Sequence, residues 1–104
     1  MAAGHRQAQE DVVRRRCTLE GRVQMVGFRM FATMHAQRLG LRGWVHNDPG
    51  GAVVVLVEGP AEPVQAFLKL LHRGPSAAEV TRFTVSEEAV DGTLEDFRAV
   101  DFSA

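Results

Sequence analysis

Apolar and polar residues alternate along the first patterned stretch of the chain, from Arg15 to Val23. The apolar or small residues at every second position are Cys17, Leu19, Gly21 and Val23. A period of two belongs to a strand with one buried face, so this stretch predicts a first strand. From Phe28 to Leu39 the period changes, and apolar residues recur every three or four positions. That spacing predicts a helix, which Gly40 ends in the usual place of a left-handed cap.

A hairpin of two strands is expected next, from Leu41 to Asn47 and from Ala52 to Glu58. The linker Asp48-Pro49-Gly50-Gly51 has proline and glycine in the positions that a type II turn favours. Within the second of these strands, Val53 to Val57 is continuously apolar. A continuous apolar run is typical of a strand in the middle of a sheet.

The rest of the chain predicts another helix and further strands. Apolar residues follow i, i+3, i+4, i+7 spacing from Glu62 to Arg73, and Gly74-Pro75 ends that helix. Glu79 to Ser86 predicts a fourth strand. Glu87 to Glu95 is polar and is expected to be a loop, and Phe97 to Phe102 predicts a weaker fifth strand.

The order of these elements predicts the fold class. Two helices are too few to cover both faces of such a sheet, so both are expected on one face. We therefore predict an α+β fold, the ferredoxin-like split βαβ sandwich, with an antiparallel sheet of four to five strands. Residues 13–104 are expected to form this single domain, and residues 1–12 a disordered leader.

Composition excludes several classes of protein. The chain has 104 residues, of which 45% are hydrophobic and 24% charged, with a net charge of −1. This charge balance argues against a nucleic-acid-binding protein, and the basic run from Arg14 to Arg16 is expected to be solvated. The longest apolar run, Ala52 to Val57, is much shorter than the roughly 20 residues of a membrane helix. The single cysteine, Cys17, is expected to be buried and fits a reducing cytoplasm.

The stretch from Gly21 to Arg29 is the strongest candidate for chemistry. A strand, a tight turn and the start of a helix bring free main-chain N–H groups and the positive end of a helix dipole together. With Arg29 at its edge, such a place attracts anions, and phosphate above all. From Gly27 and Arg29 alone, a plain connecting turn is equally compatible with the sequence.

Two segments together resemble the acylphosphatases, and the similarity spans about Thr18 to Val85. The first signature of that family is matched by Leu19, Gly21, Val23, Gln24, Val26, Phe28 and Arg29. The second is matched by Gly43, Trp44, Val45, Asn47, Gly51, Val53 and Gly59. One position departs from the first signature, because Met25 stands where the family usually has glycine.

The resemblance implies hydrolysis of acyl phosphates to a carboxylate and inorganic phosphate. Arg29 and Asn47 would be catalytic, with Arg29 gripping the phosphate and Asn47 placing the attacking water. The phosphate would be wrapped by the loop, whose binding residues are Gln24, Met25, Val26, Gly27, Phe28 and Arg29. The leaving carboxylate needs no proton, so neither a metal nor another cofactor is expected. A small-molecule acyl phosphate is the expected partner of a cytoplasmic monomer, without nucleic acid or membrane; the sequence does not identify the acyl group.

This prediction includes expectations about the structure, and alternative roles and functions remain beside it. The first two strands are expected to be neighbours, which would bring Arg29 and Asn47 to one cavity. Trp44 is expected in the core, and His35 and His46 are expected to take no part in the site. Arg29 as a surface ion-pair partner and Asn47 as a turn-starting residue are the alternatives. A non-catalytic anion-binding module disabled by Met25 is the rival function, and an interaction or nucleic-acid module using the open sheet face is a third.

Overall fold

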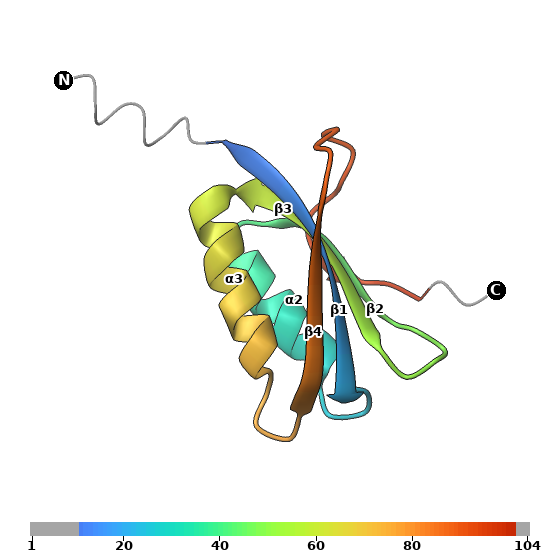
Figure 1. The fold of residues 1–104 in the computed structure, drawn as a ribbon. Coiled ribbons are helices and arrows are strands. Elements are labelled where there is room, and N and C mark those ends of the chain that lie inside the picture. The colour runs from blue at the N-terminus through green and yellow to red at the C-terminus, as the bar shows by residue number, and fades with distance from the viewer. Residues whose placement is uncertain (1–10, 102–104) are drawn as a thin grey trace.

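The structure, a computed structural model, describes residues 11–101, and its elements follow the predicted order (Figure 1). The strands are β1 (Val12–Arg22), β2 (Arg42–Asn47), β3 (Val53–Pro60), β4 (Glu79–Glu88) and β5 (Arg98–Ala99). The helices are α2 (Phe28–Arg38) and α3 (Ala61–Arg73). Residues 1–10 of the expected leader lie outside the described residues, whereas Val12 already belongs to β1. The fifth strand is shorter than expected, and Phe102 lies outside the described part.

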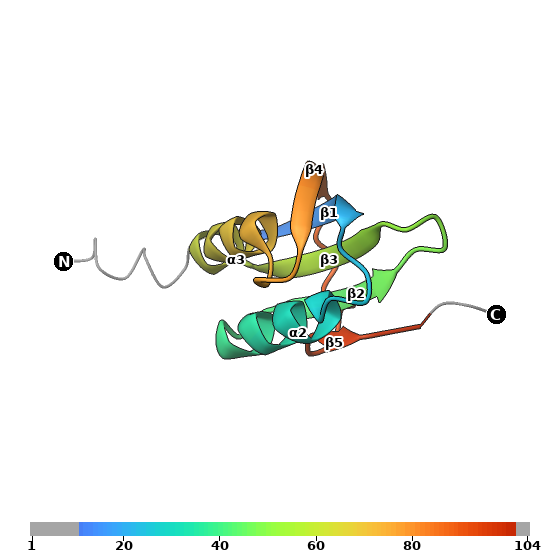
Figure 2. The same cartoon turned by 90° about the horizontal axis from the view of Figure 1, so that it is seen from below.

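The five strands form one sheet in the order β4-β1-β3-β2-β5 (Figure 2). This order contradicts the expectation that β1 and β2 are neighbours, because β3 lies between them. The crossover through α2 leaves a gap beside β1, and the β2–β3 hairpin fills it with its second strand. The sheet is also not wholly antiparallel, because β5 runs parallel to β2. The ferredoxin-like arrangement itself is confirmed.

Both helices cover one face of the sheet, as predicted (Figure 1). The core lies between the helices and the inward residues of β1, β2 and β3. Helix α2 contributes Phe28, Ala32 and Ala36, and α3 contributes Val64, Phe67 and Leu71. Cys17 is fully buried in this core, and burial raises the pKa of its thiol to about 12. The expectation that Cys17 acts as a small buried hydrophobic residue is therefore confirmed.

The end of α2 and the hairpin turn illustrate what local patterns predict. Gly40 has a φ of 72°, and Leu41 N–H donates to the Ala36 carbonyl across 2.9 Å, which confirms the left-handed cap. The hairpin turn is not type II. A type II turn needs a left-handed residue at Gly50, whereas the left-handed residue here is Gly51, with a φ of 108°. The Asp48 carboxylate accepts a hydrogen bond from Gly50 N–H at 3.0 Å, which favours this alternative turn.

The open face of the sheet carries residues that were expected elsewhere. Trp44 is half-buried and lies outside the core cluster, with its ring 5.5 Å from the Arg16 guanidinium carbon. It alternates with the core residue Val45 on β2, so it must face away from the helices. The expectation of a core tryptophan is therefore wrong, because the period of two does not show which face the helices cover.

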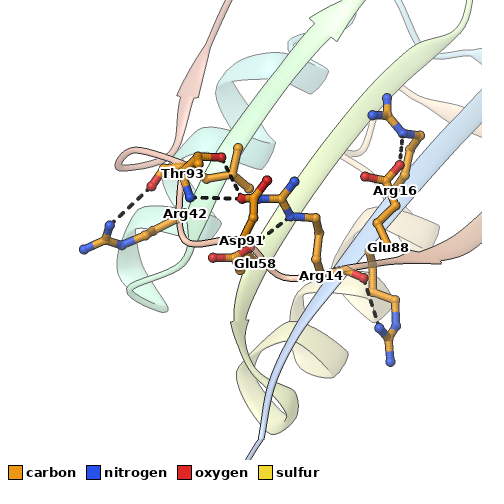
Figure 3. A network of polar contacts seen from close by, with 9 residues as sticks. Arg14, Arg16, Arg42, Glu58, Glu88, Asp91 and Thr93 are labelled. Atoms are coloured by element: carbon orange, nitrogen blue, oxygen red, sulfur yellow. Dashed lines mark hydrogen bonds and ion pairs between the residues drawn. The ribbon is translucent and has the colours of Figure 1, made fainter.

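Arg14 is also not solvated, contrary to expectation, since only 7% of it is exposed. Figure 3 shows its guanidinium between two carboxylates, those of Glu58 on β3, at 2.9 Å, and Asp91, at 2.6 Å. Burial works to lower the pKa of Arg14, but the hydrogen bond to Glu58 and the charge of Asp91 outweigh it and raise the pKa. Hydrogen bonds from Thr93, together with the charge of Arg14, lower the pKa of Asp91.

Asp91 belongs to the crossing segment, residues 89–97, which leads from β4 at one edge of the sheet to β5 at the other. This segment is held to β2, because Gly43 N–H donates to the Glu95 carbonyl at 3.0 Å. At its end Phe97 is 1% exposed and packs edge-on against Phe67, with ring centroids 5.6 Å apart. The crossing segment thus places β5 alongside β2.

Candidate active site

The cradle loop, residues 23–27, connects β1 to α2 and contains two left-handed residues. Met25 has a φ of 64° and Gly27 a φ of 80°. Left-handed residues in a tight loop turn successive N–H groups towards one concave side. The main-chain N–H groups from Gln24 to Phe28 donate no hydrogen bond to any other residue in the described range 11–101. They are therefore available to an anion.

The N-terminus of α2 adds to this positive environment. The helix begins at Phe28 directly after the loop, and Gly27 supplies no side-chain cap. The first turn contains no acidic residue. The partial positive charge of the helix dipole therefore lies uncompensated beside the free N–H groups, which is the usual setting of a bound phosphate.

Arg29 and Asn47 line one small cavity beside this loop, with a volume of about 220 Å³. Its other lining residues are Val23, Met25, Gly27, Phe28 and Met30. The expectation that the two side chains reach one cavity agrees with this geometry, although the reason given for it, adjacent strands, was wrong. Arg29 is exposed and forms no ion pair with another residue in the part of the chain that the structure describes. Asn47 is the last residue of β2, not the first of the turn.

The link between the cradle loop and β2 is the side chain of Gln24. Its amide nitrogen donates to the carbonyl of Asp48 at 2.7 Å and to that of Ala52 at 2.9 Å. These carbonyls belong to the two residues that flank the turn of the β2–β3 hairpin, next to Asn47. Sequence reasoning placed Gln24 in the phosphate-binding loop but missed this contact. The only signal in the sequence was an amide side chain inside the first signature.

Asn47 carries an unusual polar atom. Its Oδ1 is buried and accepts no hydrogen bond within residues 11–101. A buried acceptor without a partner costs on the order of 1–3 kcal/mol, so folded proteins rarely keep one without a purpose. Because Asn47 lines the cavity, a small molecule that binds against this side chain can supply the missing donor.

Met25 lies at the rim of the cavity and does not fill it. Its side chain is 100% exposed. The backbone at this position is left-handed, with a φ of 64°, so a side chain here is strained. Val26, another residue of the predicted phosphate-binding set, is half-buried and packs against the core. It can contribute to the site only through its main chain.

Three further observations concern metal ligands, membrane helices and the position of His46. No group of three or more potential metal ligands occurs among residues 11–101. Within the same range, no helix is long and apolar enough to cross a membrane. His46 is not among the residues that line the cavity. Its ring lies on the open face, with its centroid 5.3 Å from that of Trp44.

Comparison with known proteins points to one family. The acylphosphatase family model matches residues 15–99 of the chain. An acylphosphatase from Thermococcus kodakarensis is 44% identical over 88 residues, which cover 85% of this chain and 96% of the relative. One from Methylococcus capsulatus is 48% identical over 77 residues, covering 74% of this chain and 84% of the relative.

Solved structures agree with the sequence comparison. The crystal structure of an acylphosphatase from Bacillus subtilis matches with a TM-score of 0.82 and 36% identity, covering 86% of this chain and 99% of that one. The resemblance read from the sequence is therefore confirmed, and the chain belongs to the acylphosphatase family.

Proposed function

We propose that this chain hydrolyses acyl phosphates to a carboxylate and inorganic phosphate, with Arg29 and Asn47 as the catalytic residues. The observation that carries the proposal is a single cavity shared by Arg29, Asn47 and a loop whose main-chain N–H groups have no partner among residues 11–101. Membership of the acylphosphatase family supports it.

In this proposal, the phosphoryl group binds in the cradle loop. The planar guanidinium of Arg29 donates two parallel hydrogen bonds to two phosphate oxygens, and it stays charged at any relevant pH. Main-chain N–H groups from Gln24 to Phe28 and the α2 dipole stabilise the remaining oxygen. Because these donors are already in place, they stabilise the charge of the transition state without reorganising.

Asn47 holds the attacking water. The water donates a hydrogen bond to Asn47 Oδ1, the buried acceptor that has no partner among the described residues. The water oxygen forms a bond to phosphorus as the bond from phosphorus to the acyl oxygen breaks. The electron pair of the broken bond leaves with the carboxylate, a weak base that requires no general acid. Both protons of the water remain on the phosphate product.

The rival function, a binding module disabled by Met25, has less support. It requires the methionine to bend or obstruct the cradle, whereas the loop keeps left-handed residues at positions 25 and 27 and the Met25 side chain is fully exposed. The expected monomeric state and cytoplasmic location remain part of our proposal, and a single buried thiol suits a reducing compartment.

Incubating the purified chain with benzoyl phosphate in the presence of EDTA tests the proposal. We expect release of benzoate and phosphate well above the spontaneous rate. The Arg82→Ala variant is the control, because Arg82 is an exposed arginine on β4 that lines none of the cavities described here. Binding of inorganic phosphate without turnover of benzoyl phosphate would favour the non-catalytic module and overturn the enzymatic proposal.

A further inference from the structure

A larger hollow lies next to the candidate active site, along the outer side of α2. We call it the α2–β5 groove, because Met30, Thr33, Met34 and Arg38 of α2 line it together with Arg98 of β5. Its volume is about 990 Å³. It is much larger than the cavity of about 220 Å³ beside the cradle loop, which we call the cradle cavity, and it can hold more than a phosphoryl group.

The groove and the cradle cavity adjoin each other. Arg29 and Met30 line both of them. A phosphoryl group gripped by Arg29 would therefore sit where the two hollows meet. A group bonded to that phosphoryl group on the groove side can therefore extend into the groove.

The helix presents a graded surface to this groove. Met30, Met34 and Arg38 stand four residues apart, so they lie on one face of α2, each about 6 Å further along the axis. Met30 is 77% exposed and Met34 49%, which is unusual for large apolar side chains. Methionine adapts its shape to flexible apolar partners. Along the groove, the surface of α2 therefore changes from phosphate-binding at Arg29, through apolar at the two methionines, to basic at Arg38.

A second arginine reinforces the basic end. Arg98 reaches the groove from β5, and within residues 11–101 it forms one ion pair, with Glu95, at 3.3 Å. Both side chains of that pair are more than half exposed, so the pair is weak and can be exchanged for another anion. Arg38 adds its charge nearby, because it lines the same groove from the last turn of α2. Two cations without a buried partner therefore face the groove.

We propose that the α2–β5 groove binds the acyl group of the substrate and favours an extended acyl chain that ends in a second anionic group. This inference rests on the proposed function. The apolar part of the chain would lie on Met30 and Met34, and the terminal carboxylate would lie between Arg38 and Arg98. A six-carbon chain spans roughly 6 Å, the rise of one i to i+4 step, which places its terminal carboxylate beside Met34 and within reach of both arginines.

Three substrates test this inference: acetyl phosphate, hexanoyl phosphate and adipoyl monophosphate. The second and third have the same chain length and differ by the terminal carboxylate. For the unmodified chain we expect kcat/KM to be higher for adipoyl monophosphate than for hexanoyl phosphate by about tenfold, the worth of two exposed ion pairs. The Arg38→Gln, Arg98→Gln double variant should lose this preference and keep its acetyl phosphate activity within about twofold.

Two further variants sharpen the test. Met34→Glu places a negative charge in the middle of the groove, and it should lower kcat/KM for adipoyl monophosphate more than for acetyl phosphate. Arg82→Gln removes an equal charge outside the groove and should leave the preference unchanged. Equal rates for the hexanoyl and adipoyl substrates, or an equal loss for all three in the double variant, would overturn the inference while leaving the proposed function intact. Failure to hydrolyse any of the three would overturn both.

Discussion

Met25 is the residue at which this chain departs from its family signature, and its backbone explains why glycine is usual there. Its φ of 64° lies in the left-handed region, where a side chain crowds the neighbouring carbonyl. The methionine side chain is fully exposed, so no packing compensates for the strain. We therefore expect the strain at Met25 to lower the stability of the fold more than it changes the shape of the cavity.

Substituting Met25 by glycine separates strain from side-chain function. We expect Met25→Gly to be more stable than Met25→Ala by about 1 kcal/mol, because alanine keeps the left-handed strain and glycine removes it. Urea denaturation measures this difference. Benzoyl phosphate hydrolysis should be unchanged or faster in Met25→Gly. A tenfold loss of rate in that variant would instead show that the methionine takes part in the reaction.

The location of a residue in the fold was predicted well where a family signature named that residue. It was predicted less well where only the apolar pattern was available. Arg29 and Asn47 were expected in one cavity, and they line one. Trp44 was expected in the core and lies on the open face, because alternation along a strand separates two faces without saying which is covered. The second role of Gln24 was missed because a hydrogen bond to a distant carbonyl leaves no periodic trace.

At the scale of elements, the position of β2 relative to the cradle loop decides whether the site is assembled. The loop follows β1, and β3 separates β1 from β2 in the sheet. The side chain of Gln24 connects the loop to the end of β2 by donating to the carbonyls of Asp48 and Ala52, the two residues that flank the hairpin turn. We infer that Gln24 is a positioning residue, which holds Asn47 at a constant distance from the bound phosphate.

Replacing Gln24 by alanine should loosen this link. We expect kcat for benzoyl phosphate to fall about tenfold, because a misplaced water costs rate, while inhibition by inorganic phosphate stays nearly unchanged. Gln65→Ala removes an amide from the exposed side of α3 and serves as the matched control. A parallel loss of phosphate affinity would assign Gln24 to the phosphate cradle instead, and an unchanged kcat would remove it from the account.

The helices and strands were predicted within a few residues because each has a clear period and a clear end. Gly40 and Gly74, for example, follow α2 and α3 with positive φ angles, which glycine adopts without strain. Strand order was not predictable from these local patterns. Which strand enters the gap beside β1 depends on how the hairpin packs as a unit, and no residue within β2 or β3 records that choice.

At the scale of the whole molecule, the crossing segment ties the two edges of the sheet together. It was expected only as a polar loop, yet Asp91 within it closes a buried network with Arg14 and Glu58 (Figure 3). The partners lie 44 and 77 residues from Arg14 along the chain, so a basic run near the N-terminus gave no sign of them. The same segment delivers Phe97 to the core and Arg98 to the groove.

Removing Arg14 should therefore destabilise the fold as a whole. We expect Arg14→Ala to lose about 3 kcal/mol of unfolding free energy, because Glu58 would be left as a buried, unpaired carboxylate. Arg16→Ala is the matched control on the same strand and face. Its partner is Glu88, and both side chains are at least 30% exposed, so its loss should stay below about 1 kcal/mol. Equal and small losses in the two variants would show that the Arg14 network contributes little.

The central claim is that one arginine and one asparagine, brought into one cavity, carry out the hydrolysis. The most direct test is kcat/KM for benzoyl phosphate in Arg29→Ala and Asn47→Ala, beside the controls Arg82→Ala and Gln65→Ala. Each of the first two should lose a factor of about a hundred or more, roughly 3 kcal/mol of transition-state stabilisation, while the controls keep the rate of the unmodified chain. Unchanged kcat/KM in both Arg29→Ala and Asn47→Ala would contradict the account.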